Sequence, residues 1–148
     1  MQMLSTVFGG GMTSKLFQNV REKQSLCYSI GSGYYGAKGI VLVSAGIDFD
    51  KEQHVRQEVE KQLDACRRGE ISQAEVDAAR HSLISALQAV PDSPSSIENY
   101  YSTMTLNGCG MDPQRHRAAL EAVTAEDLVA AAKTLELHST YFLKGANL

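Results

Sequence analysis

The chain has 148 residues, of which 43% are apolar, and this is enough for one domain with a packed core. Its net charge of −3 and pI of about 5.8 argue against a nucleic-acid-binding surface, which would be basic. It has neither the roughly 20 consecutive apolar residues of a membrane span nor a secretory signal pattern. We therefore expect no membrane and no nucleic-acid partner, and a cytoplasmic location.

The first predicted element is a helix that ends at glycines. Residues 1–8 are apolar or hydroxyl-bearing, and three glycines follow at 9–11. Glycine readily takes the left-handed conformation that ends many helices. Thr13 or Ser14 can then cap a second helix that runs to about Lys23.

A β-hairpin is predicted next. Residues Leu26–Tyr35 alternate larger apolar side chains with small ones, which is typical of a strand. A glycine-bounded turn at 36–39 separates them from Ile40–Ile47, a nearly continuous apolar run. The two segments therefore predict an antiparallel pair.

From Asp48 to Glu136 the pattern is helical, and a last strand is predicted over His138–Lys144. Residue pairs typical of helix starts recur along the helical region. They are Asp50 with Gln53, Ser72 with Glu75, Ser93 with Pro94, Asp112 with Pro113, and Thr124 with Asp127.

This order of elements predicts a single α+β domain over residues 1–148, with helices packed on one face of a small antiparallel sheet. The hairpin has no obvious first partner, so we expect an N-terminal strand region to be missing. We also expect an exposed apolar surface near the N-terminus, through which the fragment could form a homodimer.

The cysteines and histidines do not form a recognisable site. Three cysteines, at 27, 66 and 109, are odd in number and widely spaced, with no C-x-x-C pair. This suits neither a disulfide framework nor a thiolate metal site, so we expect small buried or half-buried thiols. None of the histidines at 54, 81, 116 and 138 has the spacing of H-E-x-x-H or H-x-x-E-H, and we expect them on the surface.

A phosphate-binding loop is not supported either. In the glycine-rich stretch at 9–15, Ser14 precedes Lys15 where a Walker motif has glycine, and Leu16 follows where it has a hydroxyl. The residues alone therefore predict an α+β domain without an autonomous active site, and with no metal site of its own.

Four motifs in order resemble the second half of insulinase/pitrilysin-like (inverzincin) zinc metallopeptidases. The residues from Gly10 to Tyr28 match G-G-x-x-S-x-L-F-x-x-x-R-E-x-x-x-L-x-Y. Residues 69–80, 123–128 and 141–145 match a later helix entry, a V-T-x-E-D-L segment and the closing strand. The resemblance implies the carboxy-terminal, non-catalytic (inactive) domain of a bacterial clamshell of two related halves.

In the enzymes that the chain resembles, the first half carries H-x-x-E-H, and this chain lacks it. The resemblance therefore implies that zinc sits in a partner half, on the same polypeptide or another subunit. It also implies that Arg21 and Tyr28, seven residues apart, reach the peptide substrate near the zinc. Tyr28 would donate to the scissile carbonyl oxygen as negative charge builds, and Arg21 would hold a neighbouring carbonyl.

Three functions remain open from the sequence. The chain can be the substrate-holding, chamber-closing half of a peptidase. It can instead be a structural or assembly protein of the same fold, or a processing partner that selects a small peptide. Arg21 at a helix end and Tyr28 in a sheet also fit purely structural roles.

Overall fold

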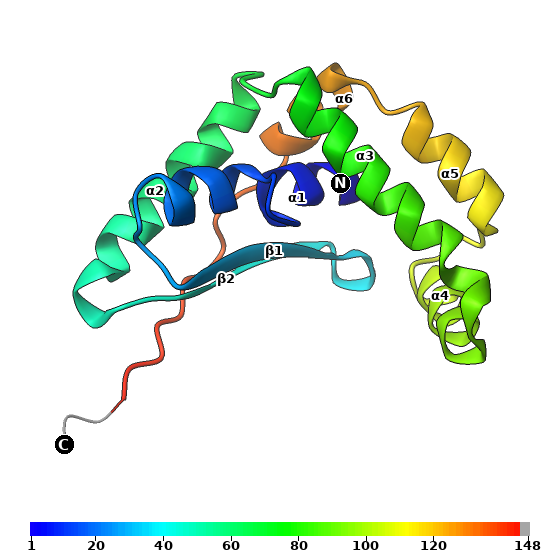
Figure 1. The fold of residues 1–148 in the computed structure, drawn as a ribbon, viewed down its shortest axis with the longest axis horizontal. Coiled ribbons are helices and arrows are strands. Elements are labelled where there is room, and N and C mark those ends of the chain that lie inside the picture. The colour runs from blue at the N-terminus through cyan, green and yellow to red at the C-terminus, as the bar shows by residue number, and fades with distance from the viewer. Residues whose placement is uncertain (146–148) are drawn as a thin grey trace.

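The computed structural model describes residues 1–145 (Figure 1). Its elements are α1 (Gln2–Gly9), β1 (Ser29–Tyr35), β2 (Ile40–Gly46), α2 (Glu52–Arg67), α3 (Gln73–Gln88), α4 (Pro94–Leu106), α5 (Pro113–Glu121) and α6 (Ala125–Lys133). A π-helical segment, Phe17–Glu22, lies between α1 and β1. Short 3₁₀ turns cover Gly36–Lys38, Phe49–Lys51 and Val90–Asp92.

The α1 helix lies between the hairpin and the other helices. It contacts β1 on one side and α2, α3 and α6 on the other. In Figure 1 the hairpin lies below α1, α2 and α3 arch over it, and α4 and α5 stand at the far end. The predicted α+β class, with helices on one face of a small antiparallel sheet, is confirmed.

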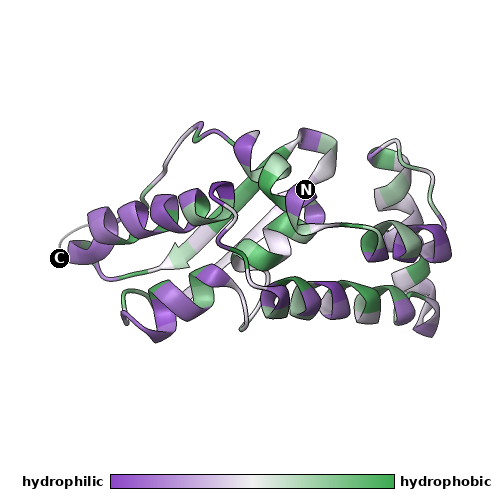
Figure 2. Cartoon of the chain, turned by 90° about the horizontal axis from the view of Figure 1, so that it is seen from above, coloured by the Kyte–Doolittle hydropathy of each residue, from purple (hydrophilic) through white to green (hydrophobic). Residues whose placement is uncertain are grey.

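The hydrophobic core is built around α1 and the helical segment that follows it. The helices of the chain carry hydrophilic and hydrophobic bands side by side (Figure 2), as expected when one face packs inward. The largest side chains with almost no exposed surface come from α1, the π-helical segment and its first turn, α2 and α6. They are Leu4, Val7, Leu16, Val20, Cys66 and Leu128.

A close approach between α1 and β1 holds the hairpin in place. A Cβ atom at Gly9 would lie 2.6 Å from the backbone nitrogen of Ser32, so only glycine fits there. The Ser32 hydroxyl donates a hydrogen bond of 2.7 Å to the carbonyl oxygen of Ser5. Because Ser5 and Gly9 are one helical turn apart, this side of α1 can lie directly on the strand.

The hairpin is confirmed, with a later start than predicted. β1 pairs antiparallel with β2 and places Ser32 opposite Val43. The strand begins at Ser29 rather than Leu26, because Leu26 is buried in the core and its N–H donates to the carbonyl of Val20, at the end of the preceding helical segment. The prediction took the alternation of side chains as pairing and missed this helical contact.

The predicted strand over residues 138–144 is wrong. Within the described residues the sheet contains only β1 and β2, and the segment after α6 makes no backbone hydrogen bonds with them. Phe142 packs edge-on against Phe49 with ring centroids 6.4 Å apart, and Lys144 Nζ lies 5.5 Å from the centre of the same ring. Side-chain contacts therefore hold residues 138–144 near the start of α2. The prediction of a strand rested on the residue pattern alone, and a strand also needs a partner to pair with.

Four of the predicted helix starts are confirmed. Ser72, Ser93, Asp112 and Thr124 each accept a hydrogen bond from a backbone N–H of the first turn. The predicted Asp50–Gln53 capping box is wrong, because a 3₁₀ turn comes before α2 and the helix has no side-chain cap. The helix predicted to end near Lys23 is present but is π-helical over most of its length.

Exposed apolar side chains do not gather where they were expected. Met3, Leu4 and Val7 of α1 are buried, so the N-terminal region does not present the predicted apolar surface. Roughly half of the surface of Ile40 and Leu42 is exposed instead, on the hairpin face that points away from α1. Homodimer formation stays a prediction.

The contact between Gly9 and Ser32 gives a test of the packing. Gly9→Ala should lower the free energy of unfolding by about 1–3 kcal/mol, because the added methyl group would collide with the β1 backbone. Gly11→Ala is the matched control, since a Cβ there meets no atom within 4 Å. Urea unfolding of both variants measures the difference, and equal stabilities would show that α1 does not press on β1 as described.

Candidate functional site

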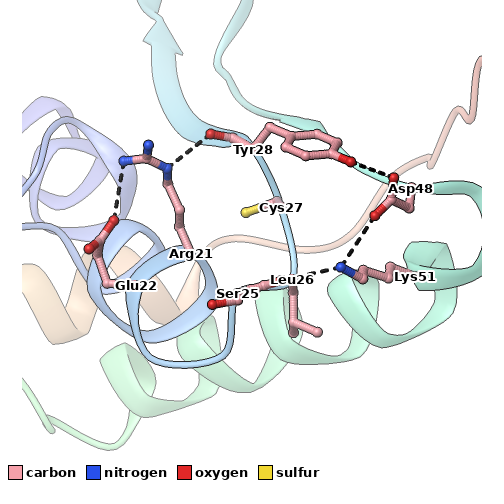
Figure 3. Close-up of a pocket in the computed structure, with 8 residues that line it drawn as sticks. All are labelled: Arg21, Glu22, Ser25, Leu26, Cys27, Tyr28, Asp48 and Lys51. Atoms are coloured by element: carbon pink, nitrogen blue, oxygen red, sulfur yellow. Dashed lines mark hydrogen bonds and ion pairs between the residues drawn. The ribbon is translucent and has the colours of Figure 1, made fainter.

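A pocket of about 400 Å³ lies where the π-helical segment turns into β1. Its wall comes from the helix end, the connecting turn, the start of β1 and the residues after β2. The lining residues are Arg21, Glu22, Ser25, Leu26, Cys27, Tyr28, Asp48 and Lys51 (Figure 3). The pocket therefore joins two parts of the chain, residues 21–28 and residues 48–51, that are separated by the whole hairpin.

Arg21 reaches the pocket from the last turn of the π-helical segment. Its Nε donates a hydrogen bond of 2.9 Å to the backbone carbonyl of Tyr28, and its Nη1 lies 3.2 Å from Glu22 Oε1. The guanidinium carbon also lies 4.6 Å from the centre of the Phe17 ring, within cation–π range. Within the described residues Nη2 makes no hydrogen bond, so the fork keeps donors for a ligand.

The turn between Arg21 and Tyr28 is conformationally unusual. Ser25 has a φ of 51°, the one positive value among the described non-glycine residues. Its N–H donates to the carbonyl of Arg21 over 3.0 Å, and its own carbonyl accepts from Lys51 Nζ over 3.3 Å. Non-glycine residues in this region are held there by their surroundings, and such residues cluster at functional sites.

Tyr28 presents its side chain on the outside, with 69% of its surface exposed. Its hydroxyl donates a hydrogen bond of 2.6 Å to Asp48 Oδ1, while Asp48 Oδ2 lies 3.3 Å from Lys51 Nζ. The hydrogen bond to Asp48 raises the pKa of the Tyr28 hydroxyl above its ordinary value. The same bond, together with Lys51, lowers the pKa of Asp48.

Arg21 and Tyr28, the pair singled out in the sequence, line the same pocket. Contact between them runs through the Tyr28 main chain. In Figure 3 the guanidinium and the phenol ring extend to different sides of that main chain, and the ring points toward Asp48. A ligand that touches both side chains must therefore extend along the turn.

Asp48 and Lys51 are site residues that the sequence reasoning missed. The predicted hairpin did carry a signal, because antiparallel pairing places the end of its second strand beside Tyr28. In the structure, Tyr28 N–H donates to the Gly46 carbonyl, two residues before Asp48. Once the hairpin is predicted, the residue after its second strand is expected beside Tyr28.

The pocket also contains Cys27, whose surroundings do not favour a nucleophilic thiolate. Burial raises the pKa of the Cys27 thiol, although Arg21 and Lys51 oppose the shift. A raised pKa reduces the thiolate that nucleophilic attack requires.

Two expectations about single residues are wrong. Cys109 is exposed, whereas a buried or half-buried thiol was expected. His116 is partly buried between helices: its Nδ1 lies 3.2 Å from the Tyr100 hydroxyl and its Nε2 lies 3.0 Å from Gln2 Oε1. Burial lowers the pKa of His116. Sequence could not show this, because both contacts join residues distant along the chain.

The described residues offer neither a metal-binding cluster nor a membrane span. Across residues 1–145 no three His, Cys, Asp or Glu side chains are grouped so that they could hold a metal ion. In the same part of the chain, no helix is both long and apolar enough to cross a membrane.

Residues 1–83, more than half of the chain, match the family model described as the peptidase M16 inactive domain. The chain belongs to this family. The M16 inactive domain is 28% identical to the "Probable inactive metalloprotease YmfF" of Bacillus subtilis strain 168, over 98% of the chain and 34% of the relative. It is 27% identical to an "Uncharacterized zinc protease" of Rickettsia bellii, over 90% of the chain and 33% of that protein.

A solved structure shares the fold. The peptidase M16 inactive domain from Pseudomonas fluorescens superposes with a TM-score of 0.75 at 20% identity, covering 91% of this chain and 33% of that one. The M16 inactive domain described here thus spans about a third of the length of its curated relatives. The predicted resemblance to the non-catalytic half of zinc metallopeptidases is confirmed.

The absence of a donor cluster leads to a test of the metal content. Purified from a zinc-containing medium and washed free of loosely held ions, the chain should retain no stoichiometric zinc and hydrolyse no peptide, because three ligands are not assembled. Elemental analysis and a fluorogenic peptide assay measure both. One tightly held zinc per chain would contradict the prediction.

Proposed function

We propose that this M16 inactive domain is the non-catalytic half of a zinc metallopeptidase-like protein. It closes a chamber over a catalytic half and helps to hold the peptide substrate. The zinc belongs to that catalytic half, on the same polypeptide or on a partner subunit. Membership of an inactive-domain family, and relatives about three times as long that are named metalloprotease or zinc protease, support the proposal.

The observation that carries the substrate-holding role is the pocket shared by Arg21 and Tyr28. A peptide backbone offers carbonyl oxygens, and both side chains carry N–H or O–H donors for such acceptors. In the part of the chain that the structure describes, Arg21 Nη2 makes no hydrogen bond, while the guanidinium binds Tyr28 and Glu22 through its other nitrogens. Tyr28, most of whose surface is exposed, places its hydroxyl farther along the same turn, where it donates to Asp48 when no ligand is bound.

The two residues would take different parts in the reaction. Arg21, fixed by a main-chain bond and by the Phe17 ring, would hold a substrate carbonyl already in the ground state. Tyr28 would donate to the oxygen on which negative charge develops, an interaction that strengthens in the transition state. Because the zinc lies in another half, both roles require closure, as in lid-type enzymes.

A second candidate function is a structural, assembly or peptide-processing partner of the same fold, without peptidase activity. The name of YmfF, a probable inactive metalloprotease, favours it. In that case Arg21 and Tyr28 only fix the turn before β1. An H-x-x-E-H motif in the partner half, together with the kinetics below, separates the two functions.

Tyr28→Phe, in the protein assembled with its zinc-bearing half, should reduce kcat by roughly a hundredfold, as loss of an oxyanion donor does. KM should change much less, because the lost interaction strengthens only in the transition state. Steady-state kinetics on a fluorogenic peptide measures both constants. The matched control is Tyr35→Phe, which alters a half-exposed tyrosine that is outside the pocket and forms no side-chain hydrogen bond in the described part of the chain.

Arg21→Ala should raise KM as well as lower kcat, because it removes a contact made in the ground state. Arg21→Lys should recover only part of the loss, since an ammonium cannot reproduce the planar fork. Circular dichroism checks that each variant is folded. Unchanged turnover in Tyr28→Phe, in an otherwise active protein, would reduce both residues to structural contacts.

A further inference from the structure

The hydroxyl hydrogen of Tyr28 is already in use in this structure. A phenol has one hydrogen to donate, and Tyr28 gives it to Asp48 over 2.6 Å, the length of a charge-assisted bond. The hydroxyl oxygen then presents only lone pairs to a third group. A substrate carbonyl, itself an acceptor, gains nothing from a tyrosine in this state.

We propose that Asp48 is a latch on Tyr28: it keeps the hydroxyl hydrogen until a substrate carbonyl displaces it, and so sets how readily Tyr28 binds substrate. This inference rests on the proposed function, because it assigns a consequence to the donor role of Tyr28. Asp48 is thus a positioning residue that acts through Tyr28. It need not touch the peptide itself.

Asp48 is held in place by a contact with the turn that precedes β1. Lys51 Nζ lies 3.3 Å from Asp48 Oδ2 and also donates over 3.3 Å to the Ser25 carbonyl. Ser25 is the residue held at positive φ, in the turn that leads from Arg21 to Tyr28. Lys51 therefore ties the carboxylate to the backbone that carries both proposed substrate contacts.

The charges around Tyr28 favour the arrangement in which its hydroxyl donates to Asp48. Asp48 is the main cause of the raised pKa of Tyr28, and Asp50 adds a smaller contribution of the same sign. The hydrogen bond from Tyr28, and after it Lys51, lower the pKa of Asp48, so the latch stays a carboxylate and a strong acceptor. Arg21 faces the other side of the main chain and does not contact the hydroxyl in this arrangement (Figure 3).

The latch is also weak enough to open. Most of the surface of Tyr28 and nearly half of the Asp48 side chain are exposed to water, and charged contacts open to solvent are screened and contribute little to stability. A substrate carbonyl brought in by the closing halves can therefore compete for the hydrogen. Once displaced, Asp48 still has Lys51 as its counter-ion.

The first arm of the test is made on the chain itself. With ¹³C-labelled tyrosine, the ring carbon next to the hydroxyl is followed by NMR as the pH is raised. Asp48→Ala should lower the pKa of Tyr28 toward that of an ordinary tyrosine, and Asp48→Asn, which keeps an acceptor but no charge, should fall between. Asp50→Ala is the matched control, because Asp50 makes no side-chain hydrogen bond within residues 1–145, and it should change little. An unmoved pKa in Asp48→Ala overturns the latch.

The second arm uses the protein assembled with its zinc-bearing half and a fluorogenic peptide. Asp48→Ala should raise kcat/KM on the order of fivefold, which is what removal of one competing hydrogen bond provides. In the Tyr28→Phe background the same substitution should have no effect, because no hydroxyl is left to release. A fall in kcat/KM on Asp48→Ala, or no change, overturns the latch.

The arms separate failure of the inference from failure of the proposed function. If Tyr28→Phe lowers turnover but Asp48→Ala does not raise it, the donor role stands and the latch fails. If Tyr28→Phe has full activity, or no peptide is cleaved by the assembly, the proposed function fails. The functional consequence of the latch then fails with it, while the NMR arm still decides whether Asp48 holds the hydroxyl.

Discussion

The closeness of α1 to β1 is the constraint on which the remaining structure depends. At Gly9 no side chain separates the helix from the Ser32 backbone, and Ser32 in turn donates to Ser5. The buried faces of α1 are then divided between the hairpin and the outer helices, so one short helix serves two layers. A bulkier residue at this point would push the hairpin away, and the pocket at its open end would move with it.

A partly buried ion pair anchors the beginning of the helical segment that carries Arg21. Lys15, only 6% exposed, lies 3.0 Å from Glu75, whose carboxylate also closes the capping box at the start of α3. Leu16 and Val20 of the same helical segment are fully buried in the core. Removing Glu75 would leave the buried Lys15 charge without its partner, which is destabilising. Arg21 thus extends from a segment that is fixed at its beginning. The nearby thiol of Cys66 is buried, and burial raises its pKa to about 11, so its role there is packing.

What the sequence could predict here was local. Capping pairs such as Ser72 with Glu75 and Thr124 with Asp127 act within four residues, so they can be read directly from the chain. The hairpin followed from two adjacent strands and a glycine-bounded turn. The segment after α6 failed because a strand also needs a free partner edge, a property of the whole sheet.

The residues of the candidate site also divide into those that a local motif predicted and those that long-range contacts bring in. Arg21 and Tyr28 came from a motif whose spacing is local, and they do line one pocket. Asp48 and Lys51 come from beyond the hairpin, and the direction of the Tyr28 ring depends on them. The partial burial of His116 against Gln2, across more than a hundred residues, could not be inferred from its polar neighbours. Long-range partners, rather than residue types, were what sequence reasoning lacked.

In the proposed function, Arg21 and Tyr28 differ in how firmly the structure holds them. Arg21 keeps its orientation through a main-chain bond and an aromatic ring, so its free donors are ready before any ligand arrives. Within residues 1–145 the exposed Tyr28 side chain is held by a single hydrogen bond, which it donates to the half-exposed carboxylate of Asp48. One contact is therefore preorganised and the other exchangeable. If the domain closes on a catalytic half as we propose, this difference is useful, because binding can begin on the rigid group while the exchangeable one responds only to a carbonyl that competes with Asp48.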